Sequence, residues 1–232
     1  MEKMDTHSVQ FYGFYHSFQD GPFAYAEYEE IENKASRLDR EAGYYIKFVN
    51  GIDKSNLNIL DFGGGLGGHY LTLKEHTTKN FNYHIVERPE SFAEINKEVT
   101  YYPNVQLAVA DFSDEIDCLY SNATIFMTKN KSAVEHIHDF CKVSPNHIFL
   151  QRSIVCEGEN YEHFYTYPST DFREGVYFSI ISEKNMIDIC ESYGYDLVYV
   201  EPIYTKFIIN NAPSDLGTIC YKDYLFKKRL EK

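Results

Sequence analysis

The sequence lacks tryptophan, closely paired cysteines and any long apolar run. Its cysteines are odd in number and widely spaced, at positions 118, 141, 156, 190 and 220. This pattern indicates neither a disulfide framework nor a zinc site, and it fits a reducing compartment. The first residues show no apolar stretch typical of a signal peptide, and no run is long enough to span a bilayer. We therefore expect a cytoplasmic protein with no membrane partner and no metal.

Basic residues are also scarce. The chain has 22 Lys and Arg against 35 Asp and Glu, which gives a formal net charge of −13. The only basic cluster is at residues 227–229, and we interpret it as a solvated segment. Because binding to a phosphate backbone needs a basic surface, we expect no nucleic-acid partner.

Length and composition predict one globular domain. The chain of 232 residues is long enough for one sizeable α/β domain and too short for two. Hydrophobic residues make up 44% and charged residues 25%, which is ordinary for a globular protein. The 21 Tyr and 17 Phe are unusually many. They either fill the core and half-exposed strand faces or line a pocket.

The most informative stretch is residues 58–70, NILDFGGGLGGHY. Its apolar run at residues 59–62 predicts a buried strand, and five of the next six residues are glycine. Glycines let the backbone turn sharply and come close to a ligand. The N–H groups of a helix that starts after them then face whatever is bound. We expect the active site here.

The glycine spacing fits two cofactors. Gly63, Gly65 and Gly68 satisfy the dinucleotide pattern G-x-G-x-x-G, whereas Gly63, Gly65 and Gly67 satisfy the D-x-G-x-G-x-G pattern of S-adenosylmethionine (SAM) enzymes. The glycines alone do not decide between them. Asp61 favours SAM, because a carboxylate there repels a pyrophosphate but attracts the cationic amino and sulfonium groups of SAM.

An acid follows the second predicted strand, at residues 83–87. Glu87 lies 22 residues after Gly65, at the tip of the second strand of a βαβ unit. There it can accept hydrogen bonds from both ribose hydroxyls of a nucleotide. The alternative is a surface acid that caps the next helix.

Asp111 and Phe112 follow a third predicted strand, at residues 105–110. Asp111 can accept a hydrogen bond from the exocyclic amine of adenine, while Phe112 covers the ring. Because three more polar residues follow, the acidic run is alternatively an ordinary loop.

Strands and helices alternate along most of the chain. An apolar stripe from Ile31 to Val49 predicts the first helix. We predict strands at residues 59–62, 83–87, 105–110, 122–127, 147–151, 195–200 and 218–226. This alternation predicts an α/β fold, a Rossmann-like three-layer α/β/α sandwich with a mostly parallel seven-stranded sheet. The last two strands have no helix between them, which predicts an antiparallel closing hairpin.

Two segments break the alternation. Residues 1–29 are rich in aromatic residues but show no sustained period, so we expect neither a strand nor one helix. We predict that they cap the carboxyl-terminal edge of the sheet, or else form a homodimer surface. Residues 153–181 also lose periodicity and are too many for a plain connection. We interpret them as a substrate-side insertion, either a hairpin or a lid.

Here the residues resemble a known family. The progression from residues 60–67 through Glu87 to residues 111–112 resembles the class I SAM-dependent methyltransferases over about residues 30–226. The segments Gly-Phe-Tyr, Asp-Phe-Gly-Gly, Val-Glu-Arg-Pro and Gly-Tyr at 13–15, 61–64, 86–89 and 194–195 resemble a group of bacterial methyltransferases often found with surface-polysaccharide gene clusters. The usual Trp of that group's N-terminal region is replaced here by Phe or Tyr.

The resemblance implies a role for each motif. Asp61 would organise the loop and hold the methionine amino group of SAM, directly or through water. Gly63, Gly65 and Gly67 would allow close approach of the backbone. Glu87 would bind the ribose, and Asp111 with Phe112 would bind the adenine. The implied reaction is O- or N-methyl transfer to a small molecule, a sugar or its nucleotide-linked or phosphorylated precursor.

The residues do not single out a general base. His69 follows the glycines directly, His16 lies in the aromatic cap, and His163 and Tyr165 lie in the insertion. Each is a candidate to face the acceptor, and each is alternatively an ordinary polar or packing residue.

Two basic residues are candidates to bind the acceptor. Lys129 and Arg152 follow the fourth and fifth predicted strands, where they can clamp an anionic acceptor such as a uronate or a phosphorylated sugar. The alternative for each is a solvated loop charge. Tyr15 in the cap is a further candidate contact for the acceptor.

Two other functions stay open at this stage. One is an NAD-type oxidoreductase, which the dinucleotide spacing allows. The other is a SAM-binding partner subunit that has the fold and the cofactor site but no catalytic activity.

Overall fold

The computed structural model of the chain describes residues 9–11, 35–87, 98–128, 131–165, 176–209 and 214–230. Its helices are α2 (Ala35–Gly51), α3 (Gly68–His76), α4 (Val105–Asp111), α5 (Ala133–Lys142) and α6 (Glu183–Ser192), with a 3-10 turn at Ser214–Leu216. Its strands are β1 (Val9–Phe11), β2 (Asn56–Phe62), β3 (Asn80–Val86), β4 (Thr100–Tyr102), β5 (Cys118–Asn122), β6 (Met127–Thr128), β7 (His147–Cys156), β8 (Tyr161–Tyr165), β9 (Val176–Ser182), β10 (Tyr195–Ile209) and β11 (Ile219–Lys228).

Seven strands form the central sheet, in the order β4-β3-β2-β5-β7-β11-β10. Strands β4, β3, β2, β5 and β7 pair in parallel. Strand β11 is antiparallel to both of its neighbours, β7 and β10. This confirms the predicted α/β fold, a mostly parallel seven-stranded sheet with an antiparallel last strand.

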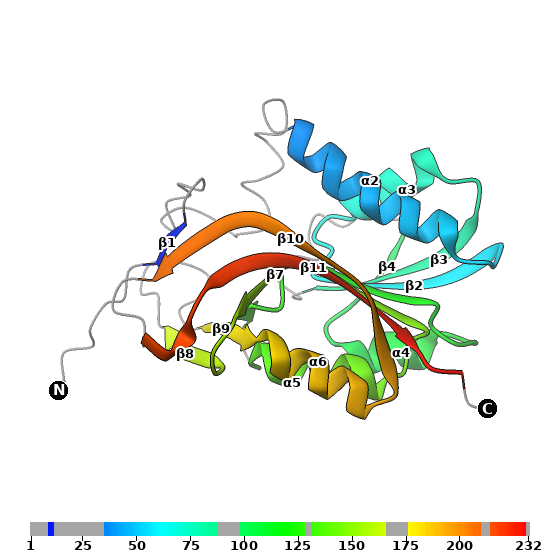
Figure 1. The fold of residues 1–232 in the computed structure, drawn as a ribbon. Helices are drawn as coiled ribbons and strands as arrows, with labels where there is room; N and C mark the ends of the chain where they lie inside the picture. The colour runs from blue at the N-terminus through cyan, green and yellow to red at the C-terminus, as the bar shows by residue number, and fades with distance from the viewer. Residues whose placement is uncertain are drawn as a thin grey trace.

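The sheet lies between two layers of helices, as Figure 1 shows, with α2 and α3 on one side and α4, α5 and α6 on the other. Successive residues of a strand point to opposite faces, so each strand contributes to both cores. Ile59 packs with Tyr45 of α2 and Leu73 of α3. Leu60 packs with Ile137 and its neighbours on the other face. Both faces of the parallel strands are therefore buried, as a three-layer fold requires.

Local sequence signals explain two of the helices. Helix α2 carries the part of the predicted apolar stripe that lies from Ala35 on, and residues 31–34 lie outside the described residues. Helix α5 begins with a capping box, in which the Ser132 side chain accepts from the Glu135 N–H and the Glu135 carboxylate accepts from the Ser132 N–H.

Two predicted strands are wrong. Residues 105–110 form helix α4, which begins because the Asn104 side chain accepts a hydrogen bond from the Leu107 N–H at 2.9 Å. The strand of that unit is the shorter β4. The strand predicted at residues 122–127 is found earlier in the chain, as β5. The prediction missed it because Asp117 and Ser121 interrupt the apolar run of this segment.

The two segments without periodicity contain strands as well. In the N-terminal segment, β1 pairs antiparallel with the end of β10, so the prediction of no strand is wrong for residues 9–11. The rest of that segment lies outside the described residues. Strand β7 continues to Cys156, past the predicted end at residue 151. Strands β8 and β9 form an antiparallel hairpin, and β9 also joins β7. None of the described helices is both long and apolar enough to cross a membrane.

Candidate functional site

The strand order reverses direction between β2 and β5, two neighbours in the middle of the sheet. From β2 the chain continues to β3 and β4 on one side, and it then returns to β5 on the other. In open α/β sheets such a switch leaves a crevice at the carboxyl ends of the two strands, where ligands bind. Asp61 and the glycine loop lie at this end of β2.

The glycine loop needs its glycines. Gly63, Gly65 and Gly67 have φ angles of 77°, 54° and 82°, a left-handed region that side chains disfavour. A Cβ atom on Gly63 would lie 2.2 Å from Thr124 Oγ1, in the segment after β5. The Gly63 N–H donates to Val86 O at 2.8 Å. The loop is therefore held tightly between β3 and the chain that follows β5.

Asp61 lies directly beneath the loop and is fully buried. Its Oδ2 accepts hydrogen bonds from Tyr83 at 2.8 Å and from His69 Nδ1 at 2.9 Å. A Cβ atom on Gly64 would come within 2.4 Å of the same oxygen. The Asp61 carboxylate therefore packs against the loop and leaves no room for a side chain at Gly64.

Three buried tyrosines surround this carboxylate. The Tyr45 and Tyr83 hydroxyls lie 3.3 Å apart, and the Tyr45 ring stacks on Tyr120 with 3.8 Å between centroids. Burial, and then the nearby Asp61 charge, raise the pKa of Tyr83 well above its usual value. Burial raises the pKa of Tyr45 in the same direction. Both phenols therefore stay protonated, and Tyr83 donates to Asp61.

Glu87 follows β3 and reaches the same loop. Its Oε2 accepts from the Gly65 N–H at 3.1 Å, and its own N–H donates to Tyr102 O at 3.0 Å. Its side chain is half-buried at the edge of the sheet. The structure thus brings Asp61, the glycines and Glu87 together, as the sequence predicts.

Asp111 and Phe112 require a correction. They lie at the end of helix α4 rather than at the end of a strand. Asp111 is exposed and accepts a hydrogen bond from the Tyr102 hydroxyl. Burial, and then this hydrogen bond, raise the pKa of Tyr102 to about 12. The Phe112 ring stacks on buried His84, with centroids 3.9 Å apart. Binding of adenine by these two residues stays a prediction.

Four buried polar atoms in the described part of the chain have no hydrogen-bond partner: Asp61 Oδ1, His84 Nδ1, Ser121 Oγ and Asn122 Oδ1. All four belong to the last three residues of β2, β3 or β5. An unsatisfied buried polar group costs about 1–3 kcal/mol, so such groups are rare and call for an explanation. Their shared position marks the carboxyl edge of these three strands as a place for a polar ligand or ordered water.

A bulge bends β7 beside this edge. Arg152 has a φ angle of 53°, and its N–H donates to the buried carboxylate of Asp223 at 2.8 Å. The pairing with β11 shifts register at the same point. Gln151 is the preceding residue. Its Oε1 accepts from the Tyr120 hydroxyl at 2.5 Å, and its Nε2 donates to Asp223 Oδ2 at 3.4 Å. Bulges of this kind redirect side chains and are common near active sites.

The other candidate catalytic and acceptor-binding residues either lie away from the glycine loop or fall outside the described residues. His163 and Tyr165 fall in β8, opposite Phe178 and Val176 of β9. Arg152 lies with its guanidinium carbon 6.0 Å from the ring centre of Tyr221. Tyr15, His16 and Lys129 lie outside the described residues.

The sequence did not predict five buried polar residues that form hydrogen bonds between the elements around the site. These are Tyr45, Tyr83, Tyr120, Gln151 and Asp223. The sequence signal for two of them was a polar residue next to an apolar run, as with Gln151 after residues 148–150 in β7 and Asp223 before residues 224–226 in β11.

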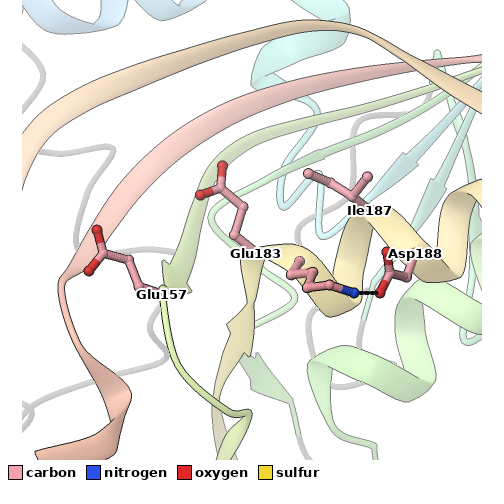
Figure 2. Close-up of a pocket in the computed structure, with 5 residues that line it drawn as sticks. Glu157, Glu183, Ile187 and Asp188 are labelled. Carbon is pink, nitrogen blue, oxygen red and sulfur yellow. Dashed lines mark hydrogen bonds and ion pairs between the residues drawn. The ribbon is translucent and has the colours of Figure 1, made fainter.

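A pocket of about 350 Å³ lies elsewhere, at the start of α6, and Figure 2 shows its lining. Glu183 bonds to Lys222 and Tyr224, Lys184 pairs with Asp188, and Glu157 accepts from the Thr218 N–H. The polar side chains of this pocket thus already have partners within the protein, whereas unpartnered polar atoms lie near the glycine loop. We therefore place the functional site at the glycine loop. In the described ranges, no cluster of three or more His, Cys, Asp or Glu could hold a metal ion.

No family model matches the chain, and no curated protein matches its sequence. Solved structures do match its fold. The N-terminal domain of EvdMO1, solved with S-adenosylhomocysteine (SAH) bound, gives a TM-score of 0.56 at 11% identity over 85% of each chain. The magnesium protoporphyrin IX methyltransferase ChlM from Synechocystis PCC 6803, also solved with SAH, gives 0.51 at 9% identity over 90% of each chain. The [4+2]-cyclase SpnF gives 0.53 at 9% identity, over 83% of this chain and 81% of that chain.

At these identities the likeness concerns the fold alone. The sheet order and the antiparallel last strand match the Rossmann-like fold of these solved structures. The glycine loop lies at the carboxyl ends of the parallel strands, the edge where open α/β sheets bind ligands, with Asp61 in β2 and Glu87 directly after β3.

Proposed function

We propose that the chain is a SAM-dependent methyltransferase that acts on a small molecule. The observation that carries this proposal is the set of four unpartnered buried polar atoms at the ends of β2, β3 and β5, next to a loop that tolerates no side chain at Gly63. Two structures of the same fold were solved with SAH bound, which supports the choice of cofactor.

The residues present fit SAM. Glu87 stands at the end of β3, where a carboxylate can accept both ribose hydroxyls, and the Gly65 N–H that it now binds would be freed by that exchange. Asp61 gives the loop a negative charge, which suits a cationic donor and opposes a pyrophosphate. Asp111 and Phe112 would contact the adenine.

SAM supplies an activated methyl group, so the protein has little covalent chemistry to perform. The chain would hold donor and acceptor in line and exclude water, and this positioning would supply most of the rate. The tight loop and the buried strand ends suit that task, because they can move little when the ligands bind.

We propose a sugar as the acceptor, or its nucleotide-linked or phosphorylated precursor, destined for a bacterial surface polysaccharide. The resemblance of four short sequence segments to a group of methyltransferases from such gene clusters supports this. Arg152, in the bulge of β7, would hold an anionic group of the acceptor, together with Lys129 and Tyr15.

A second function has one observation in its favour. SpnF, a protein of the same fold, is named for a cyclisation and not for methyl transfer. The chain would then bind SAM without transferring its methyl group, as a partner subunit does.

Calorimetry with SAH, SAM and NAD tests the cofactor. We expect saturable binding of SAH and SAM and none of NAD. Saturation by NAD without SAH binding would overturn the proposal in favour of an oxidoreductase.

Transfer of radiolabelled methyl from SAM tests the reaction. The acceptors are a hexuronate, a hexose phosphate and a nucleotide-linked hexose, with a neutral hexose as control. We expect transfer to an anionic acceptor. Binding of SAH without transfer to any of them would favour the partner-subunit function.

A further inference from the structure

The His69 ring lies between a buried acid and a buried aromatic ring. Its Nδ1 is 2.9 Å from Asp61 Oδ2, and its edge meets the face of Tyr120 at 89°, with centroids 4.9 Å apart. Tyr45 contacts the ring at a second edge, with centroids 6.2 Å apart. The imidazole is therefore fixed in orientation rather than free on the surface.

The hydrogen bonds define which nitrogen carries the proton. A carboxylate oxygen can only accept, and Asp61 Oδ2 already accepts from the protonated Tyr83 hydroxyl at 2.8 Å. The contact with His69 is therefore an Nδ1–H donated to the same oxygen. In a neutral imidazole, one nitrogen donates and the other keeps a lone pair, so Nε2 is the basic nitrogen.

The His69 side chain is also partly exposed. About 26% of the His69 side chain is exposed, whereas Asp61 is fully buried. Within the described residues, no hydrogen bond involves Nε2. His69 is the second residue of α3, immediately after the glycine loop. His69 therefore lies at the edge of the sheet where the cofactor is proposed to bind.

We propose that His69 is the catalytic base and that Asp61 and Tyr83 are its positioning residues. This rests on the proposed methyl transfer, and it gives Asp61 a role other than direct contact with the cofactor. The acceptor hydroxyl gives its proton to Nε2 while its oxygen bonds to the methyl carbon. The bond from that carbon to the sulfonium breaks, which leaves a neutral thioether and an imidazolium. The positive charge thus moves from sulfur to His69, beside the Asp61 carboxylate.

Nitrogen-15 NMR of the histidine rings tests the positioning without any acceptor. In the full chain saturated with SAH, we expect neutral His69 as the Nδ1–H tautomer, which is the rarer form in free histidine. In Asp61→Asn the common Nε2–H tautomer should return. His69→Gln assigns the signal, and His76 at the exposed end of α3 is the reference ring. An Nε2–H tautomer in the wild-type protein would overturn the inference.

Binding and turnover test the role of the base. In His69→Gln we expect the Kd for SAH to change by less than about threefold, while methyl transfer to a hydroxyl acceptor falls by about 10²-fold or more. His76→Gln is the matched control and should match the wild type in both. A tenfold loss of SAH affinity in His69→Gln would make His69 a cofactor contact instead. Failure of the wild-type protein to bind SAH would refute the proposed function, and the tautomer in the ligand-free protein would still decide the positioning.

Discussion

Gly63 shows how one missing side chain shapes the site. Its φ angle is positive, and a Cβ atom there would lie 2.2 to 2.6 Å from three atoms of the Thr124 side chain. We expect Gly63→Ala to destabilise the protein by about 1–3 kcal/mol, through backbone strain and this overlap, and to abolish SAH binding. Urea unfolding measures the first effect and calorimetry the second.

Gly43→Ala is the control for this substitution. Gly43 lies inside α2, and a Cβ atom there meets nothing within 4 Å. Because alanine favours helix, we expect stability to rise by about 0.5–1 kcal/mol with SAH binding unchanged. Equal effects of the two changes would contradict the role given to Gly63.

Asp223 holds the β7 bulge. It is buried, and its carboxylate accepts the Arg152 N–H at 2.8 Å. We expect Asp223→Ala to lower the free energy of unfolding by about 1–3 kcal/mol, because the partly buried Arg152 N–H loses its acceptor. Urea denaturation checks this, with exposed Asp53→Ala as the control. A loss no greater than that of the control would show that the bulge does not depend on Asp223.

At the residue scale, the sequence predicts what is local. Asp61 and the glycines lie within one short segment, and Glu87 follows from the regular length of a βαβ unit. Tyr83, Gln151 and Asp223 could not be predicted as site residues. Their partners lie 22, 31 and 71 residues away along the chain, and only the folded sheet brings them together.

Helix α5 depends on its capping box. Ser132 Oγ accepts from the Glu135 N–H, and Glu135 Oε2 accepts from the Ser132 N–H at 2.8 Å. We expect Ser132→Ala to destabilise the protein by about 1 kcal/mol, because a donor of the first turn loses its partner. Thermal unfolding measures the effect. Exposed Ser113→Ala should leave the melting temperature unchanged, and a similar loss in both variants would contradict the assignment.

At the element scale, prediction fails where short segments carry two signals. Residues 105–110 contain two valines and alternate like a strand, but the cap at Asn104 starts a helix instead. Strand β5 was missed because Asp117 precedes it directly and Ser121 lies within it, so that its apolar run is short. Asp117 can be buried because its carboxylate accepts hydrogen bonds from Lys54 Nζ at 2.8 Å and from the Asn58 N–H. The sequence does not show these partners, which lie 63 and 59 residues earlier in the chain.

His136 links the stability of the whole molecule to pH. It is buried against Phe62, and burial lowers its pKa to about 4, with a smaller effect from Lys131. Below about pH 6.5 the unfolded chain binds a proton at this residue and the folded chain does not, so stability falls with pH down to about 4. Between pH 7.5 and 5.5 this amounts to about 1.4 kcal/mol.

The variant His136→Gln should remove this part of the pH dependence. His84 and His147, whose pKa values burial also lowers, are present in both proteins and cancel in the comparison. Urea midpoints at the two pH values measure the difference. Equal losses in wild type and variant would mean that His136 titrates normally in the folded protein.

At the scale of the molecule, the sequence predicts the architecture well because the alternation of apolar strands and amphipathic helices leaves few arrangements. It offers the hairpin of β8 and β9 only as one of two alternatives for residues 153–181, without their bounds, and it does not predict β6. These three strands pair mainly with one another, and their runs of two, five and seven residues stand apart from the alternation of strands and helices.

The order of the strands also has a consequence for synthesis. Strand β11 lies between β7 and β10, and in the described pairings it alone joins β10 to the parallel strands. A nascent chain therefore makes β10 before its neighbour exists, and that strand's edge stays exposed until β11 leaves the ribosome. The glycine-loop half can assemble earlier, from strands that are already complete. The later half is then the part of this protein most in need of a chaperone.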